Sequence, residues 1–168
     1  MEHTKSSKLP EDFENARKYF ERGLQMAKKM FHVSEHPWFI LLRLGLGLVA
    51  IEQNHLDKAE DQILGHAKKM IKNSENQRLW VQYYKVVAKL QEKKKQFNEA
   101  LESLKRASVI IQEILPNKLT HAEIQIQKAQ IYHANVFHLD VDEVDELKEM
   151  VNSIGNSRLS KQVEDLGF

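Results

Sequence analysis

An internal repeat constrains this chain more than any other feature of its sequence. The stretch HLDKAEDQILGHA, residues 55 to 67, aligns with QFNEALESLKRA, residues 96 to 107, when the sequence is shifted by 41 residues. A third copy, FENARKYFERG at residues 13 to 23, aligns with the first at a shift of 43. Self-similarity at a period of this size is typical of arrays in which one small structural unit recurs. The coinciding residues are apolar or small: Leu56 with Phe97, Ala59 with Ala100, and Ile63 with Leu104.

The spacing of apolar residues inside the copies predicts helices. Ala59, Ile63, Ala67 and Met70 recur every three or four residues, and Ala100, Leu104, Ala107 and Ile111 do the same. No segment alternates apolar and polar residues as a half-buried strand does, and the Asn-Gly and Asp-Gly hairpin turns are absent. The sequence therefore predicts an all-α chain with helices at 11–32, 36–53, 56–72, 75–94, 97–115, 120–138, 141–154 and 157–166.

Helix starts can be placed from prolines and capping residues. Pro10, Pro37 and Pro116 each stand where a helix could begin, because proline is tolerated in a first turn and disrupts a helix interior. Capping boxes occur at Ser74 to Gln77, Thr120 to Glu123 and Asp140 to Glu143. We expect residues 1–10 to be a disordered N-terminal segment and residues 11–168 to form a single helical-repeat domain.

The repeat resembles the tetratricopeptide repeat family over about residues 11 to 115. In that family's helical hairpin, a small residue of the first helix lies where the two helices approach closely, and large apolar residues and an alanine recur along the second. The period of 41 to 43 residues exceeds the family's usual length of about 34, and is similar to the longer variants of kinesin-light-chain-like arrays and of bacterial regulator and sensor proteins. The resemblance implies antiparallel hairpins, about seven or eight helices in all, stacked as a short right-handed solenoid. The matching residues are Leu46-Gly47, Leu56, Ala59 and Ile63 in one repeat, and Val87-Ala88, Phe97, Ala100, Leu104 and Ala107 in the next.

A pair of glycines offers a competing interpretation. Gly45, Gly47 and Ala50 have the spacing of a dinucleotide-binding turn, and an apolar run precedes them. Such a turn needs a strand before it and a further βα unit after it. The residues downstream are helical, however, and the repeat replaces Gly47 by Ala88. We therefore expect these small residues to allow close helix packing, and we predict no bound cofactor.

No metal or nucleophile site can be assembled from the sequence. His32 and His36 are separated by a predicted helix break at Pro37, and His133 and His138 fall on different sides of a helix. The acidic stretch at 140–147 lacks the glycine and the final glutamate of a calcium loop and suits a helix first turn instead. The chain has no cysteine. We expect no metal and no enzyme activity.

Net charge and hydropathy narrow the range of partners. The formal net charge is +1, which lacks the excess of basic residues that marks a nucleic-acid binder. The apolar run at 38–51 is shorter than the about 20 residues that span a bilayer, and the N-terminus lacks the apolar core of a secretory signal. We therefore expect a cytoplasmic protein that binds neither nucleic acid nor membrane. Residues 73–118 carry nine basic and five acidic groups and 119–168 carry four and nine, so the middle should prefer an acidic partner.

The resemblance also implies a binding surface, because the first helices of such hairpins line a concave face. The alternative for the three leucines among its residues is that the N-terminal helix simply covers them. For the polar residues of 82–92 the alternative is an ordinary solvated helix face. The implied partner-binding residues are Leu41, Leu44, Leu48, Gln82, Lys85, Lys89, Glu92, Gln130 and His133.

Three functions remain open from the sequence. The first is a non-enzymatic scaffold that binds a protein or an extended peptide, with a homodimer as a further option. The second is a ligand-sensing regulatory fragment of a larger bacterial signalling or transcriptional regulator. The third is a small cofactor-binding enzyme whose polar residues come together from distant parts of the chain.

Overall fold

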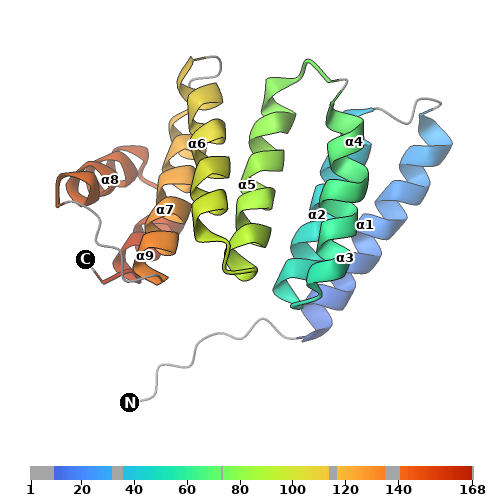
Figure 1. Ribbon diagram of the computed structural model, residues 1–168, viewed down its shortest axis with the longest axis horizontal. Helices are drawn as coiled ribbons and strands as arrows, with labels where there is room; N and C mark the ends of the chain where they lie inside the picture. Colours follow the sequence, from blue (N-terminus) through green and yellow to red (C-terminus); the bar gives the residue numbers. More distant parts are fainter. Residues whose placement is uncertain (1–9, 32–35, 73, 114–116, 135–140, 168) are drawn as a thin grey trace.

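The computed structural model describes residues 10–31, 36–72, 74–113, 117–134 and 141–167, and within these ranges every regular element is helical (Figure 1). The prediction of an all-α chain is therefore confirmed. Most predicted boundaries agree with the observed ones within a few residues, although positions 135–138 of one predicted helix lie outside the described residues. The elements are α1 Pro10–Met30, α2 Pro37–Glu52, α3 Leu56–Glu60, η1 Asp61–Ala67, α4 Lys68–Ile71, α5 Gln77–Lys93, α6 Phe97–Glu113, α7 Lys118–Ala134, α8 Val141–Ile154 and α9 Ser157–Glu164.

Two local features differ from the prediction. Pro10, assigned above to the N-terminal segment, is the first residue of α1, and residues 1–9 lie outside the described residues. The helical segment from Leu56 to Ile71 is continuous, and its central part, η1, is wound as a π-helix. Such wide turns are rare in proteins, and the apolar spacing of the sequence gives no sign of this one.

Asparagines, not the predicted serine and threonine, begin two of the helices. The Asn76 side chain accepts a hydrogen bond from the Arg78 amide at the start of α5, while Ser74 accepts from the Asn76 amide one step earlier. At α7 the Asn117 side chain accepts from the Thr120 amide, so the helix starts before Thr120. Both asparagines serve as N-caps as well as serine or threonine would. The third predicted start, Asp140, lies outside the described residues.

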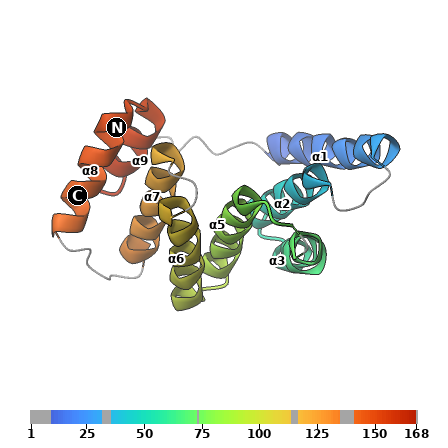
Figure 2. The same cartoon turned by 90° about the horizontal axis from the view of Figure 1, so that it is seen from above.

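Each helix packs against helices that are next to it, or a few elements away, in the chain. α2 contacts α1, the α3–η1 rod and α5; α5 contacts α6; α6 contacts α7; and α7 contacts both α8 and α9. The buried side chains accordingly form a series of clusters between neighbouring helices. Seen from above, α1, α2, α5, α7 and α9 follow an arc, with α3 and α6 on its outer side (Figure 2).

The two glycines of α2 are packing residues. Both are buried inside the helix, so no strand-to-helix turn exists at this position. A Cβ on Gly45 would lie 2.4 Å from the Phe20 ring of α1, and one on Gly47 would lie 2.5 Å from the Ile63 side chain of η1. α2 is therefore packed between α1 and η1, and this packing on two sides explains why its sequence is apolar all round. Among the described residues, no helix is long and apolar enough to cross a membrane.

Candidate functional site

A groove on the inner side of the arc collects most of the residues that the sequence implies for binding. Its volume is about 300 Å³, and its lining comes from α2, α5, α7 and α9. Six of the nine implied residues line it: Leu48, Gln82, Lys85, Lys89, Glu92 and Gln130. The four helices thus bring together positions that lie up to 114 residues apart, from Leu48 to Gln162.

The other three implied residues lie elsewhere. Leu44 is only 3% exposed and belongs to the core between α2, η1 and α5, so a ligand cannot reach it. The prediction that Leu44 binds a partner is therefore wrong. Leu41 is 42% exposed on α2, which shows that α1 does not cover it. His133 is exposed near the end of α7 and is not among the residues that line the groove.

The two groove lysines are already paired with carboxylates of neighbouring helices. Lys85 Nζ lies 2.5 Å from Glu123 Oε2 of α7, and Lys89 donates to Glu52 of α2. The Gln127 side-chain amide also donates to the Lys85 backbone carbonyl, at 3.3 Å. These contacts fix α5 against both neighbours. They also neutralise the basic face that the sequence analysis expected to attract an acidic partner.

Apart from these ion pairs, the polar side chains that line the groove are mostly amides. Gln82, Gln130 and Gln162 line the groove together with Gln127, and each primary amide can both donate and accept hydrogen bonds. Arg158 of α9 also lines it and makes no ion pair with any other described residue. Arg158 and Gln162 were not predictable from the sequence, because α9 follows the last recognisable repeat and no spacing places it beside α5.

Glu92 stands at the end of the groove in a half-buried position. Burial raises the pKa of its carboxyl above the ordinary value of 4.5, while the charges of Lys93 and Lys89 act in the opposite direction and that of Glu52 adds to the rise. A carboxyl of this kind can accept or donate a proton closer to neutrality than an exposed glutamate. Among the described residues, no basic side chain forms an ion pair with Glu92.

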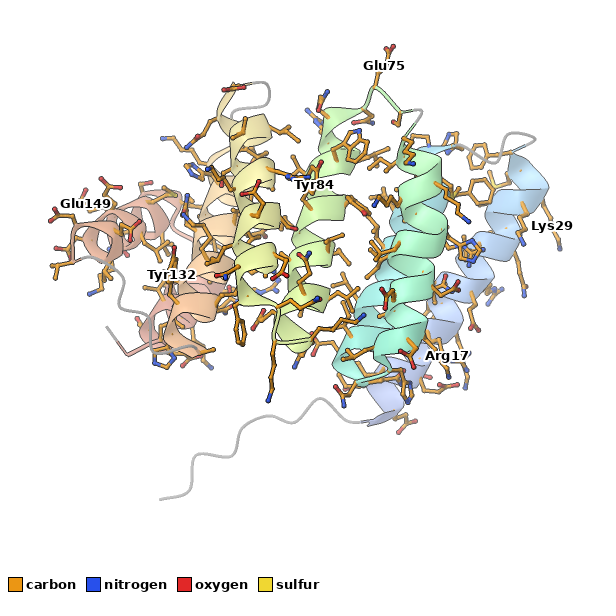
Figure 3. All side chains as sticks on the ribbon, viewed as in Figure 1. Arg17, Lys29, Glu75, Tyr84, Tyr132 and Glu149 are labelled. Atoms are coloured by element: carbon orange, nitrogen blue, oxygen red, sulfur yellow. The ribbon has the colours of Figure 1, made fainter. Side chains whose placement is uncertain are left out.

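A second and larger cavity, of about 680 Å³, lies between α1, α2 and the α3–η1 rod. Arg17 lies on its α1 side, 2.5 Å from Glu14 and 2.6 Å from Glu21, and Figure 3 shows Arg17 near the beginning of α1. Gln62 on the opposite wall accepts from Arg43 at 2.7 Å. The charged and amide groups of this cavity are thus largely engaged with one another.

The histidines do not gather around any point of the described structure. His36 caps α2, accepting from the Trp38 amide at 3.3 Å, and its ring stacks on Phe31 with the centroids 3.8 Å apart. His121 contacts Gln125, and burial lowers its pKa. No group of three or more metal-ligating side chains occurs among the described residues, while His32 and His138 lie outside them.

The described residues thus form an all-helical fold with an open groove lined by both polar and apolar side chains. No protein-family model, no curated protein and no solved structure matches the chain.

Proposed function

We propose that this chain is a non-enzymatic binding module, built from helical hairpins similar to tetratricopeptide repeats, that holds an extended peptide segment of another protein in the groove between α5 and α7. The observation that supports the proposal most is the convergence of four glutamines and Arg158 from three helices on one open groove. Extended peptides present a backbone donor and acceptor at each residue, which side-chain amides complement in both senses.

The charges of the groove define the ligand further. Lys85 and Lys89 hold Glu123 and Glu52, so they stabilise the groove rather than contact a ligand. Arg158 has no such partner in the described part of the chain and can pair with a carboxylate of the bound segment, because a guanidinium binds a carboxylate with two parallel hydrogen bonds. We therefore propose a peptide that is mainly uncharged and polar and that carries one acidic group at the α9 end.

Selection from a displayed library of random peptides tests this function. The immobilised full chain should enrich peptides that share a sequence, and these should bind Arg158→Gln more weakly by about tenfold, the loss expected for one charge-assisted contact. Lys161→Gln removes a cation from the same helix without touching the groove lining and should leave binding unchanged. Enrichment of peptides that bind both variants equally would contradict the proposed site.

A further inference from the structure

A second surface lies beside the groove and is apolar. Five of the eight large hydrophobic side chains that are exposed among the described residues belong to α1 and α2. Tyr19 is 74% exposed, Met30 67% and Trp38 58%. We name this set the α1–α2 apolar surface; it comprises Tyr19, Met26, Met30, Trp38 and Leu41.

The geometry of the two helices places these side chains on one side of the hairpin. Successive residues of a helix are separated by 100°, so Tyr19, Met26 and Met30 form one stripe along α1. Met30 is half a turn round the helix from Glu21, which borders the cavity shared with η1. On α2, Trp38 is likewise half a turn from Gly47, which packs on η1. Both sets of side chains therefore face away from η1.

The α1 part and the α2 part of this surface meet at one end of the hairpin, where α1 ends and α2 begins. The Phe31 ring, directly after Met30, stacks on His36, two residues before Trp38. Phe39 of α2 and Ala27 of α1 meet in the core beneath. Met30 and Trp38 are thus fixed close to each other by residues on either side of them.

The charged residues beside the apolar surface from Arg22 to the end of α1 are cations, whereas Asp12, on the same face of α1, lies seven residues before Tyr19. Arg22 and Lys29 follow the Tyr19–Met30 stripe on its solvent side, and neither makes an ion pair with another described residue. From Arg22 to the end of α1 the helix carries no acidic residue. The acidic residue of α2, Glu52, is at the far end of that helix and pairs with Lys89. Figure 3 shows Lys29 at the outer edge of the molecule, near the end of α1.

We propose that the α1–α2 apolar surface docks an amphipathic helix of a partner protein, with apolar residues at spacings of three and four and with aspartate or glutamate along its flank. An amphipathic helix binds a partner by laying its apolar face on an exposed apolar surface, with anchor residues at spacings of three and four. Tyrosine, tryptophan, methionine and arginine are the residues enriched at protein interfaces. The bordering cations, Arg22 and Lys29, match the acidic flank. This surface shares no lining residue with the groove and goes beyond the function proposed above.

A pair of synthetic helices tests the proposal. The probe is a designed peptide of about five turns with leucine at the spacing of one helix face and glutamate on the rest, and its counterpart has lysine in place of glutamate. We expect the full chain to bind the glutamate peptide saturably, and the lysine peptide more weakly by about tenfold or more. Vesicles containing phosphatidylserine should bind neither the wild type nor its variants.

Matched variants locate the contact. Arg22→Glu with Lys29→Glu should weaken binding of the glutamate peptide by about tenfold. Lys28→Glu with Lys105→Glu changes the net charge equally but alters the other flank of α1 and the outer helix α6, so binding should hardly change. Met26→Ser with Met30→Ser should also weaken binding, while Val109→Ser, another exposed apolar position, should not.

Three results would overturn the proposal. The first is equal loss of binding in the two charge-reversal pairs, which would indicate only a long-range effect of net charge. The second is the absence of saturable binding of the glutamate peptide to the wild type. The third is binding to anionic vesicles that depends on Arg22 and Lys29 while the peptide does not bind, which would assign the surface to a lipid headgroup layer.

Discussion

Asn54 and Lys95 adopt the same left-handed backbone conformation, with φ of 59° and 60°, at positions that the internal repeat aligns. The hydrogen bonds around them also correspond: the His55 amide donates to Ala50 and the Gln96 amide donates to Gln91. The turn that ends α2 is therefore rebuilt at the end of α5. At these two turns, the residues that the sequence aligns share one backbone geometry.

This equivalence gives a first prediction about stability. A lysine in the left-handed region costs about 1–2 kcal/mol, whereas glycine adopts it freely and asparagine tolerates it. We expect Lys95→Gly to raise the free energy of unfolding by about 1 kcal/mol in urea denaturation. Lys93→Gly, two residues earlier in the last turn of α5, should lower it by about the same amount. Similar losses in the two variants would refute the strain argument.

The second prediction concerns the close approach of α2 to η1. An added Cβ at Gly47 would lie 2.5 Å from the fully buried Ile63 side chain, which has no room to move. Overpacking lowers the free energy of unfolding by about 1–3 kcal/mol, and the better helix propensity of alanine offsets about 1 kcal/mol of that loss. We expect Gly47→Ala to destabilise the protein by about 1 kcal/mol.

Gly65 provides the control for this prediction. A Cβ there would meet only the exposed Asp61 carboxylate, at 2.9 Å, and that side chain can rotate away. Gly65→Ala should therefore cause no loss of stability. If Gly47→Ala were as stable as the wild type, the glycine would have a role other than packing, and titration with NADH would then be the next measurement.

The third prediction follows from the pairing of the groove lysines. Lys85→Glu would place two carboxylates together at Glu123 and should lower the free energy of unfolding by about 1 kcal/mol or more, since the pair is partly buried. Reversing both residues, Lys85→Glu with Glu123→Lys, should recover most of the loss. Additive losses in the double variant would mean that the two side chains do not interact in solution.

The fourth prediction is a pH dependence that originates at Glu92. Because burial raises the pKa of Glu92 in the folded protein, the unfolded chain releases this proton first as the pH rises above 4.5. The contribution of Glu92 to stability therefore falls between pH 4.5 and the raised pKa, and stays low above it. Glu92→Gln should melt at a higher temperature than the wild type at about pH 7 and at nearly the same temperature at about pH 4. Glu99→Gln, on an exposed position of α6, should show no such difference, and a gain that persists at low pH would argue against titration as the cause.

Local sequence signals were sufficient to predict the helices. Apolar residues every three or four positions, together with prolines and polar caps, give most helix ends within a few residues. The π-helical turn of η1 was not predictable in this way, because its apolar residues, Ile63 and Ala67, keep ordinary helical spacing. The start of α5 at Asn76 was missed because Ser74 completes a better-known capping pattern two residues earlier.

The groove shows where local signals end. Gln82, Lys85 and Lys89 share one face of α5, and their spacing alone predicts this correctly. Leu44 was assigned to the surface because the resemblance to tetratricopeptide repeats implies a groove position there. Since α2 is apolar all round, the spacing of its residues could not correct this assignment. Arg158 and the two carboxylates that pair with the lysines lie on helices other than α5. Their positions beside α5 depend on how the helices pack, which the repeat pattern does not predict.

Binding of an extended peptide in the groove between α5 and α7 can be observed by an NMR titration. The ¹⁵N-labelled full chain is titrated with a peptide selected from the random library. We expect the largest shifts at the amides and side-chain NH₂ groups of Gln82, Gln127, Gln130 and Gln162, and little change on the outer helix α6. Shifts concentrated on α6, or around the cavity between α1 and η1, would contradict binding in this groove.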